Sequence, residues 1–398
     1  MNEPARSAFM PREEMVEKAV GRKQVTIGIP RDVHDDEKRV ALTPEAVKIL
    51  TDSGNEVFME RGAGEHSGFT DREYSDNGAM VAETSAKVYD CDIIIKIAPF
   101  KQKEASQLRG SQTVISFMNA ATMSEEVLSV LMRRRVTALA SERIMDSDGV
   151  LPVVESMSEI SGIASVLLAS DCLSSTSGGK GVMLGGVTGV TPTEVIIIGA
   201  NTAGEYAARA ALGLGAIVRV FDTSVHRLRN FQNLLGQRLY TSTFHPQVLQ
   251  KALKSADVLI GALSTDILMP WFYVTEEMVQ GMKRGSVIID LSVDTGGCVE
   301  TTEPRAIKDP IYEKHGVIHY SAWNLPSRVP KTASIALSNV FRPLMQEIAD
   351  AGGITPMLKF NNGLRNGVYI YNGILTNEVL GQKFGILSKD INLLLAAF

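Results

Sequence analysis

The sequence predicts an α/β protein of two domains, each built on a parallel sheet, with long helices between them. Short apolar runs rich in β-branched residues alternate with helical segments, which is typical of buried parallel strands covered by helices. The chain has 398 residues and 44% hydrophobic content. We expect two domains because a single core stops growing at about 250 to 300 residues.

The most informative stretch is a strand, a glycine turn, a helix and a second strand. Four β-branched residues at Val195–Ile198 predict a buried strand, and Gly199 and Gly204 bracket a tight turn into an alanine-rich helix. A second strand at Ile217–Phe221 ends in Asp222. This order is typical of a Rossmann-like domain, and we expect both domains to be Rossmann-like.

The turn and the acid predict NAD binding. Free N–H groups and the positive dipole end of the helix attract a pyrophosphate, and Asp222 is spaced to accept the ribose hydroxyls while repelling a 2′-phosphate. Asn201 replaces the middle glycine, and we expect it to keep the turn because asparagine tolerates left-handed backbone angles. The alternative is a Rossmann-like layer without a ligand. The predicted turn contacts are Gly199, Ala200, Asn201, Thr202, Ala203 and Gly204.

Composition excludes several classes of partner. A formal net charge of -5 gives no electrostatic case for nucleic acid or an anionic membrane. Three distant cysteines without a CxxC pair argue against a disulfide framework or a metal site and favour a reducing compartment. No apolar run reads as a membrane span, and the acidic residues within 1–24 exclude a signal peptide, so we expect a cytoplasmic protein.

Further elements follow in chain order. Thr43 and Pro44 open a helix that ends near Gly54, a long helix spans 157–173, and an ordered glycine-rich turn covers 174–189. Another long helix at 334–350 is expected to return with the tail to the first domain. The predicted strands lie at 25–30, 56–59, 92–97, 113–118, 137–140, 258–262, 286–291 and 317–321. The predicted domains are 1–152 and 329–398, which hold the substrate, and 153–328, which binds the nucleotide.

A cleft between the two domains is the expected active site. Arg39 follows one strand of the first domain and Lys96 sits at the end of another, where an open α/β sheet binds ligands. An arginine fork and a lysine charge suit a 2-oxo acid, because one clamps the carboxylate and the other polarises the keto oxygen. The alternatives are an ion pair of Arg39 with Glu37 or Asp36, and a snorkelling Lys96.

Asp294 follows a strand of the second domain and precedes two glycines, so we expect its carboxylate to face the cleft. It would hold the cofactor ribose or pair with an ammonium, and the alternative is an Asx-turn cap.

A resemblance to alanine dehydrogenases, and to the NAD-binding part of proton-translocating transhydrogenases, covers nearly the whole chain. It rests on eight stretches in one order, namely VTIGIPRDVHDDEKRVALTPE, RGAGEHSGFTD, DIIIKIAPF, LPVVESMSEISG, GGKGVMLGGVTGV, IIIGANTAG, IIDLSVDTGGCVE and AWNLPSRVPKTAS. The short segment 228–256 and the stretch GGKGVMLGGVTGV are more similar to alanine dehydrogenase, since the transhydrogenase carries a long mobile loop.

The resemblance implies reversible oxidative deamination of L-alanine to pyruvate and ammonia with NAD, in a homo-oligomer expected to be a hexamer. By this resemblance Arg39 and Lys96 hold the substrate and Asp294 lies beside it. The residues that it places at the cofactor are Ser158, Asp222, Asn324, Asp294 and, near the adenosine ribose, Arg227.

Asn119 stands where alanine dehydrogenases carry a histidine assigned as the general acid/base. Asparagine can orient a carbonyl or a water but cannot move a proton near neutral pH. The catalytic set is therefore predicted as Lys96, Asp294 and Asn119, with proton transfer by Asp294, by a water or by His66. The alternatives are a transhydrogenase-like subunit that binds NAD without deaminating, and an enzyme of the saccharopine dehydrogenase type.

Overall fold

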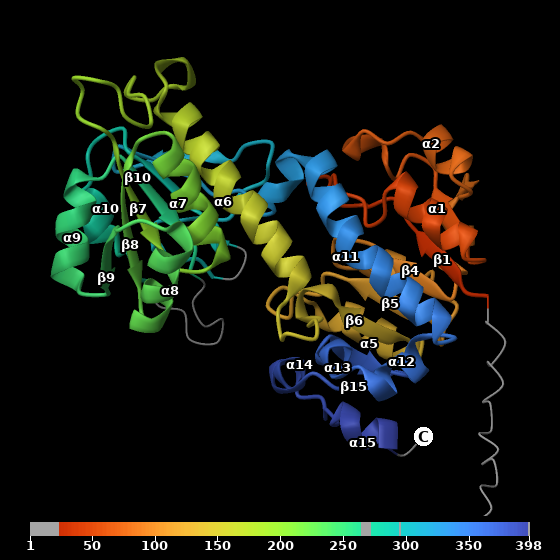
Figure 1. The fold of residues 1–398 in the computed structure, drawn as a ribbon. Helices are drawn as coiled ribbons and strands as arrows, with labels where there is room; N and C mark the ends of the chain where they lie inside the picture. The colour runs from red at the N-terminus through yellow and green to blue at the C-terminus, as the bar shows by residue number, and fades with distance from the viewer. Residues whose placement is uncertain (1–23, 264–271, 294–295, 397–398) are drawn as a thin grey trace, which may run out of the picture.

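The computed structural model describes residues 24–263, 272–293 and 296–396. They form two lobes, each with one central sheet, and the long helix α6 (Pro152–Leu173) runs from one lobe to the other (Figure 1). The predicted α/β class with two Rossmann-like sheets is confirmed. The domain boundaries themselves stay a prediction.

The first lobe is an eight-stranded sheet in the order β15-β14-β6-β5-β4-β1-β2-β3. Strands β1 to β6 pair in parallel, and β14 joins β6 in the antiparallel sense. The strands are β1 Thr26–Ile29, β2 Glu56–Glu60, β3 Met80–Ala82, β4 Ile93–Ile95, β5 Thr113–Ser116, β6 Thr137–Ala140, β14 Val368–Tyr371 and β15 Ile374–Leu375.

The second lobe is a seven-stranded sheet in the order β12-β13-β11-β10-β7-β8-β9. Only its edge pair β12–β13 is antiparallel among the described pairings. The strands are β7 Glu194–Ile198, β8 Ile217–Asp222, β9 Tyr240–Thr243, β10 Val258–Gly261, β11 Val287–Asp290, β12 Ile311–Lys314 and β13 Val317–Tyr320.

The two sheets share one topology. In the first sheet β1 lies between β2 and β4, and in the second sheet β7 lies between β8 and β10. The chain therefore reverses its direction of winding between β1 and β4 and between β7 and β10. Ligands of doubly wound sheets bind beyond the carboxyl ends of the strands at such reversals. The fold therefore marks one binding edge in each lobe.

Helices cover the faces of both sheets. Those of the first lobe are α1 Pro44–Asp52, α2 Asp71–Asp76, α3 Ser85–Tyr89, α4 Gln102–Ala105, α5 Glu125–Arg133, α11 Pro330–Asp350, α12 Ile354–Phe360, α13 Asn362–Asn366, α14 Glu378–Phe384 and α15 Ile391–Ala396. Those of the second lobe, after α6, are α7 Thr202–Gly213, α8 Val225–Leu235, α9 Pro246–Ser255 and α10 Glu276–Gln280. Short 3-10 turns are η1 Glu65–Ser67, η2 Ser141–Arg143, η3 Ser175–Ser177 and η5 Leu325–Arg328.

The predicted return of the tail to the first lobe is confirmed. Leu337 and Phe341 of α11 lie in the same core as β1 and α1, and β14 adds a strand beside β6. Thr43 caps α1 as predicted, with Pro44 as its first residue. The predictions did not include β3, β9, β12, β14 or β15, because all five strands are short. All of them except β14 lie at the edge of a sheet.

Helix α6 begins five residues earlier than predicted, at Pro152. By length and composition alone it is apolar enough to cross a membrane, a test that a core helix of a soluble protein also passes. Here Val153 lies in the first core and Leu173 in the second, and the helix packs against α7 and α11. Its apolar character therefore serves contacts with both lobes.

His319 on β13 makes the stability of the second lobe depend on pH. It is fully buried, its Nδ1 donates to the carbonyl of Val317 (3.0 Å), and its Nε2 accepts from Thr301 Oγ1 (2.8 Å). Burial lowers the pKa of His319 to about 4. The unfolded chain takes up this proton near pH 6.5, so stability is complete above that pH and falls as the pH drops toward 4.

We expect His319→Gln to flatten this dependence of the free energy of unfolding on pH, as measured by urea unfolding at a series of pH values between about 4 and 7. The exposed His226 on α8 supplies the control, because His226→Gln should retain the slope of the wild type. An unchanged slope in His319→Gln would contradict the assignment.

Candidate active site

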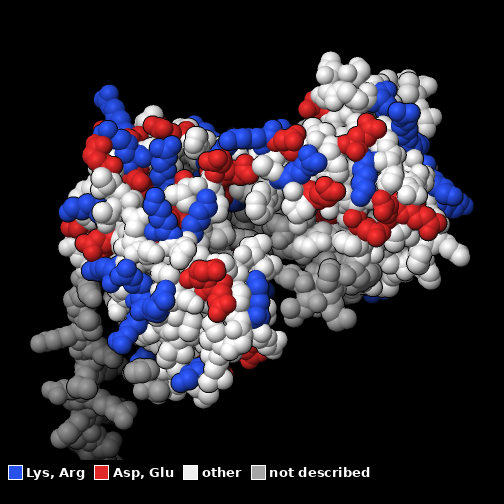
Figure 2. All heavy atoms as spheres, turned by 180° about the vertical axis from the view of Figure 1, so that it is seen from behind, with Lys and Arg blue, Asp and Glu red and all other residues white. Residues whose placement is uncertain are grey.

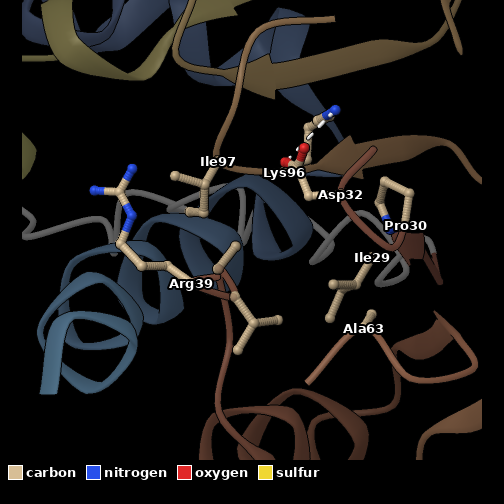
Figure 3. Close-up of a pocket in the computed structure, with 9 residues that line it drawn as sticks. Ile29, Pro30, Asp32, Arg39, Ala63, Lys96 and Ile97 are labelled. Atoms are coloured by element: carbon tan, nitrogen blue, oxygen red, sulfur yellow. Dashed lines mark ion pairs between the residues drawn. The ribbon is translucent and has the colours of Figure 1, made fainter. Parts of the chain in front are cut away.

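The pocket of interest lies at the carboxyl ends of β1 and β4, where the first sheet reverses its winding (Figure 3). It has about 220 Å³ of empty space, part of which is open to solvent, and is lined by Ile29, Pro30, Asp32, Arg39, Val40, Ala41, Ala63, Lys96 and Ile97. Three of these side chains are charged, and the others are apolar. The predicted pair Arg39 and Lys96 is thus brought to one pocket, although Ile97 lies between the two cationic groups in Figure 3.

Arg39 is held by a neighbouring acid. Its Nε donates to Glu37 Oε1 (2.8 Å) and its Nη2 to Oε2 (2.6 Å), while Nη1 reaches the Sδ atom of Met157 (3.3 Å). The ion pair with Glu37 considered as an alternative is therefore present, but it is not a surface pair. The side chains of Arg39 and Glu37 are 11% and 3% exposed.

Glu37 also connects the two lobes. Asn324 and Ser327 follow β13 of the second lobe, and they donate to the Glu37 carboxylate from Nδ2 (3.0 Å) and Oγ (3.4 Å). Burial works to raise the pKa of Glu37, but the charge and hydrogen bonds of Arg39, with help from Asn324, outweigh it and hold the pKa below its usual value. The carboxylate stays ionised and orients Arg39.

Lys96 is buried, with 2% of its surface exposed, so it does not snorkel. Its Nζ lies 2.5 Å from Glu104 Oε1 and 3.6 Å from Asp32 Oδ2. The Glu104 carboxylate also accepts from the Tyr89 hydroxyl (2.9 Å) and from the backbone N–H of Lys101 (2.8 Å). These bonds compensate for burying the charges.

Sequence reasoning did not single out Asp32. Its Oδ1 accepts from the backbone N–H of His34 (3.0 Å) and its Oδ2 from that of Ala98 (3.2 Å), which joins the loops that follow β1 and β4. The signal was its position just beyond the first strand of a doubly wound sheet. It was hidden because four acidic residues follow that strand within eight positions.

Asn119 is not among the residues that line the pocket. It has a φ of 37°, and its Oδ1 accepts from the N–H of Ala121 (3.2 Å). Its own N–H donates to Glu142 (2.9 Å), a half-buried acid that also accepts from Met118 (3.1 Å). Burial raises the pKa of Glu142, although these N–H groups oppose the change. The Asn119 loop is thus fixed by its own backbone.

Lys383 of α14 secures the other side of this loop. Its Nζ donates to the carbonyls of Ala120 (3.1 Å), Ala121 (2.7 Å) and Met123 (3.1 Å). His66 is exposed on η1 and does not line the pocket. Its position agrees with the surface histidine considered as the alternative.

The glycine turn sits at the second reversal, between β7 and β10. Gly199 has a φ of 112°, and a Cβ added at Gly204 would lie 2.0 Å from the Gly199 carbonyl oxygen. Asn201 is extended, with a φ of -111°, so the expected left-handed conformation is wrong. Its side chain caps α7 instead, accepting from Gly204 N–H (3.0 Å) and donating to the Ala262 carbonyl.

Asp222 is buried at the end of β8, beside the turn. It accepts from the N–H groups of Ala200 (2.8 Å) and Ser224 (2.7 Å) and from Nε of Arg227 (2.9 Å). Burial works to raise the pKa of Asp222, but these bonds, with that of Arg227 the strongest, keep it low. Thr202 and Ala203 begin α7.

The structure describes no contact of the other two predicted site residues, Ser158 and Asp294, with the pocket or the glycine turn. Ser158 is half-buried on α6, and Asp294 lies outside the described residues. Within the described ranges, no cluster of three or more His, Cys, Asp or Glu side chains could hold a metal.

Comparisons with known proteins agree with this geometry. The family model "Alanine dehydrogenase/PNT, N-terminal domain" matches residues 28–161, and "Alanine dehydrogenase/PNT, C-terminal domain" matches residues 165–378. The chain belongs to this family. The resemblance found in the sequence is therefore confirmed.

Individual relatives match this protein over most of its length. Alanine dehydrogenase 2 of Staphylococcus aureus (strain USA300) is 36% identical over 366 residues, which cover 92% of this chain and 98% of that protein. A solved L-alanine dehydrogenase superimposes with a TM-score of 0.84 at 34% identity, covering 90% of this chain and 99% of its own. A transhydrogenase from Sinorhizobium meliloti shares the fold, with a TM-score of 0.75, 24% identity, and coverage of 88% and 98%.

The turn of this alanine dehydrogenase/PNT chain offers a matched pair of substitutions on one helix. We expect Gly204→Ala to lower the free energy of unfolding by about 1 to 3 kcal/mol, because its methyl group meets the Gly199 carbonyl. Gly213→Ala, at the other end of α7, has nothing within 4 Å and should be neutral or slightly stabilising. Urea unfolding measures both, and equal effects would show that the turn is not tightly packed.

Proposed function

We propose that the protein is an NAD-dependent alanine dehydrogenase that interconverts L-alanine with pyruvate and ammonia. The observation that carries the proposal is the pocket at the first reversal, where Arg39 and Lys96 line one small space. A 2-oxo acid needs both groups, one for its carboxylate and one for its keto oxygen. The family and the alanine dehydrogenases at 34–36% identity supply the same assignment.

Arg39 keeps donors for a substrate although it is paired with Glu37. The Glu37 carboxylate uses the Nε side of the guanidinium, while Nη1 contacts only a thioether sulfur among the described residues. Sulfur is a weak acceptor that a carboxylate displaces readily. Glu37 therefore fixes the plane of the Arg39 guanidinium, and Nη1 would donate to the substrate carboxylate.

The second lobe suits NAD. The N-terminus of α7 presents backbone N–H groups at a turn whose glycines leave no room for a Cβ, and the Asp222 carboxylate lies beside it. NAD, when bound there, accepts or returns the hydride of the substrate 2-carbon. Asp222 would hold the adenosine ribose and disfavour a 2′-phosphate. Ser158, Arg227, Asn324 and Asp294 stay predicted contacts.

During the reaction, Arg39 would hold the substrate carboxylate and Lys96 would stabilise negative charge on the keto oxygen. The short contact of Lys96 with Glu104 keeps the ammonium in place without blocking all three of its N–H donors. Asn119 would orient the carbonyl or a water, and Asp294 would face the substrate ammonium.

A second candidate is an NAD-binding protein without deaminase activity. It is favoured by Asn119, whose side-chain oxygen is occupied by a local bond to Ala121 and which cannot move a proton. The match in length and identity to alanine dehydrogenases favours the first proposal.

A cytoplasmic homo-oligomer, expected to be a hexamer, completes the proposal. Exposed apolar side chains gather on α6 and on the loop that follows it, while the charged residues of both signs are interspersed over the face in Figure 2. The apolar set is Ile163, Leu167, Met183, Val187 and Val190. Such a surface is typical of contacts between subunits.

The activity is tested by NADH oxidation with pyruvate and ammonium across about pH 6 to 10. We expect turnover in the wild type and a fall in kcat/KM of about 10² to 10³-fold in Lys96→Met, since a preorganised donor to the oxyanion is lost. Lys103→Met, at an exposed position on α4, is the control and should match the wild type.

Equal kcat/KM values for Lys96→Met and the wild type would contradict the oxyanion role. NADH binding without turnover at any pH would instead support the second candidate. In that case, activity gained by Asn119→His would show that the pocket is intact and only the proton transfer is missing.

For the oligomer, we expect Leu167→Asp to shift the mass in solution toward smaller species. The substitution places a charge in the apolar surface, where a subunit contact would bury it. Light scattering after gel filtration measures the mass. Leu234→Asp on α8 changes a leucine of similar exposure, 58% against 61%, and should leave the mass unchanged.

A further inference from the structure

The pocket contains one carboxylate among its lining residues, and it belongs to Asp32. We propose that Asp32 is the catalytic acid–base of the deamination, moving the protons that Asn119 cannot move. This inference rests on the proposed function and names a group within the same site. It is carried by the position of Asp32 at the sheet reversal and by the charges around it.

The buried charges do not balance without an additional positive charge. Lys96 lies 2.5 Å from Glu104 and 3.6 Å from Asp32, so one ammonium faces two carboxylates. The side chains of Lys96 and Glu104 are 1% and 3% exposed, and that of Asp32 is 10% exposed. Because Glu104 takes the shorter contact, Asp32 carries the surplus negative charge. A proton or the ammonium of a substrate neutralises it.

The groups around Asp32 shift its pKa in both directions, and the net effect is upward. Burial raises the pKa of Asp32 most strongly, Lys96 and the His34 N–H lower it, and Glu37 and Glu104 raise it, so that the net pKa is above that of an ordinary aspartate. Glu60, at the end of β2, also has a raised pKa, again chiefly by burial. Other charged or titratable residues near Asp32 are Tyr89 at the end of α3, Arg31, His34 and Arg39.

The geometry holds the carboxyl group in one orientation. The backbone N–H groups of His34 and Ala98 fix its two oxygens from the loops after β1 and β4. Figure 3 shows the Asp32 carboxyl group directed toward the Lys96 ammonium, which holds the substrate oxygen in the proposed function. A proton carrier next to the oxygen that gains and loses a proton is what the chemistry needs.

The substrate enters as an ammonium and first gives one proton to the solvent, so that the neutral amine can release the hydride. After the hydride has left the 2-carbon, water adds to the iminium, the C–O bond forms, the C=N electron pair moves to nitrogen, and Asp32 takes a proton from the water. Asp32 then gives this proton to the amine nitrogen. The C–N bond breaks with its pair on the departing ammonia, the C=O bond forms, and Asp32 accepts the hydroxyl proton. That proton leaves with ammonia as ammonium.

Other acids and bases near the site are less suited. The Glu142 carboxylate fixes the Asn119 loop and does not line the pocket. His34 directs its Nε2 to the carbonyl of Pro99 (3.2 Å). Glu104 is joined to Lys96, Tyr89 and Lys101. Asp32 is the acid that both faces the pocket and has a surplus charge.

The test compares Asp32→Asn, Asp32→Glu and the control Asp35→Asn in alanine oxidation by NAD as a function of pH. Asp35 lies three positions away, is 87% exposed and pairs with Lys308 at the surface. We expect Asp32→Asn to lower kcat by about 10² to 10⁴-fold and to lose the acidic limb of the pH profile while its affinity for NADH is retained. Asp32→Glu should keep the limb at a shifted pH, and Asp35→Asn should match the wild type.

An acidic limb that survives in Asp32→Asn, or one that disappears in Asp294→Asn but not in Asp32→Asn, would overturn the proposal. A wild type without alanine turnover would refute the proposed function separately. In that event the protonation of Asp32 is read by infrared spectroscopy of the carboxyl groups between about pH 5 and 8. A protonated carboxyl signal present in the wild type and missing in Asp32→Asn supports its proton-carrying role, and no difference refutes it.

Discussion

One buried carboxylate joins the two halves of the candidate site. Glu37 accepts two hydrogen bonds from Arg39 of its own lobe, and it also accepts from Asn324 and Ser327 of the other lobe. Ser327 also accepts from the backbone N–H of Lys38 (2.8 Å). The residue proposed to hold the substrate and a segment predicted to contact the cofactor thus share one hydrogen-bonded unit. A change in the angle between the lobes would necessarily disturb the orientation of Arg39.

The rest of the site follows from two sheets with the same topology. The first reversal brings Asp32 and Lys96 together from loops that are far apart in sequence, and the second brings Gly199 against Ala262. The first pocket is small and rich in charge, whereas the second edge is a glycine turn at the N-terminus of α7. One fold used twice therefore provides an anchor for a small acid and another for a dinucleotide.

Much of this could be predicted. The β-branched strands, the glycine turn and the capped helix at Thr43 depend on local sequence, and their positions were predicted within a few residues. Edge strands such as β9 and β15 were missed because they are short and gain their stability from pairing. The conformation of Asn201 was predicted wrongly, since its side chain bonds to Ala262, which directly follows β10 and lies 61 residues away in the sequence.

By itself the sequence determined the α/β class, the nucleotide-binding unit and the family, because each depends on local patterns and on the order of motifs along the chain. Only the tertiary structure decided which acid meets which cation. Asp32, Glu37 and Glu104 are all plain acidic residues in the sequence, and their partners are set by loops that converge from different strands. Burial then gives these pairings their effect, since a charge shielded from water depends on its nearest neighbours.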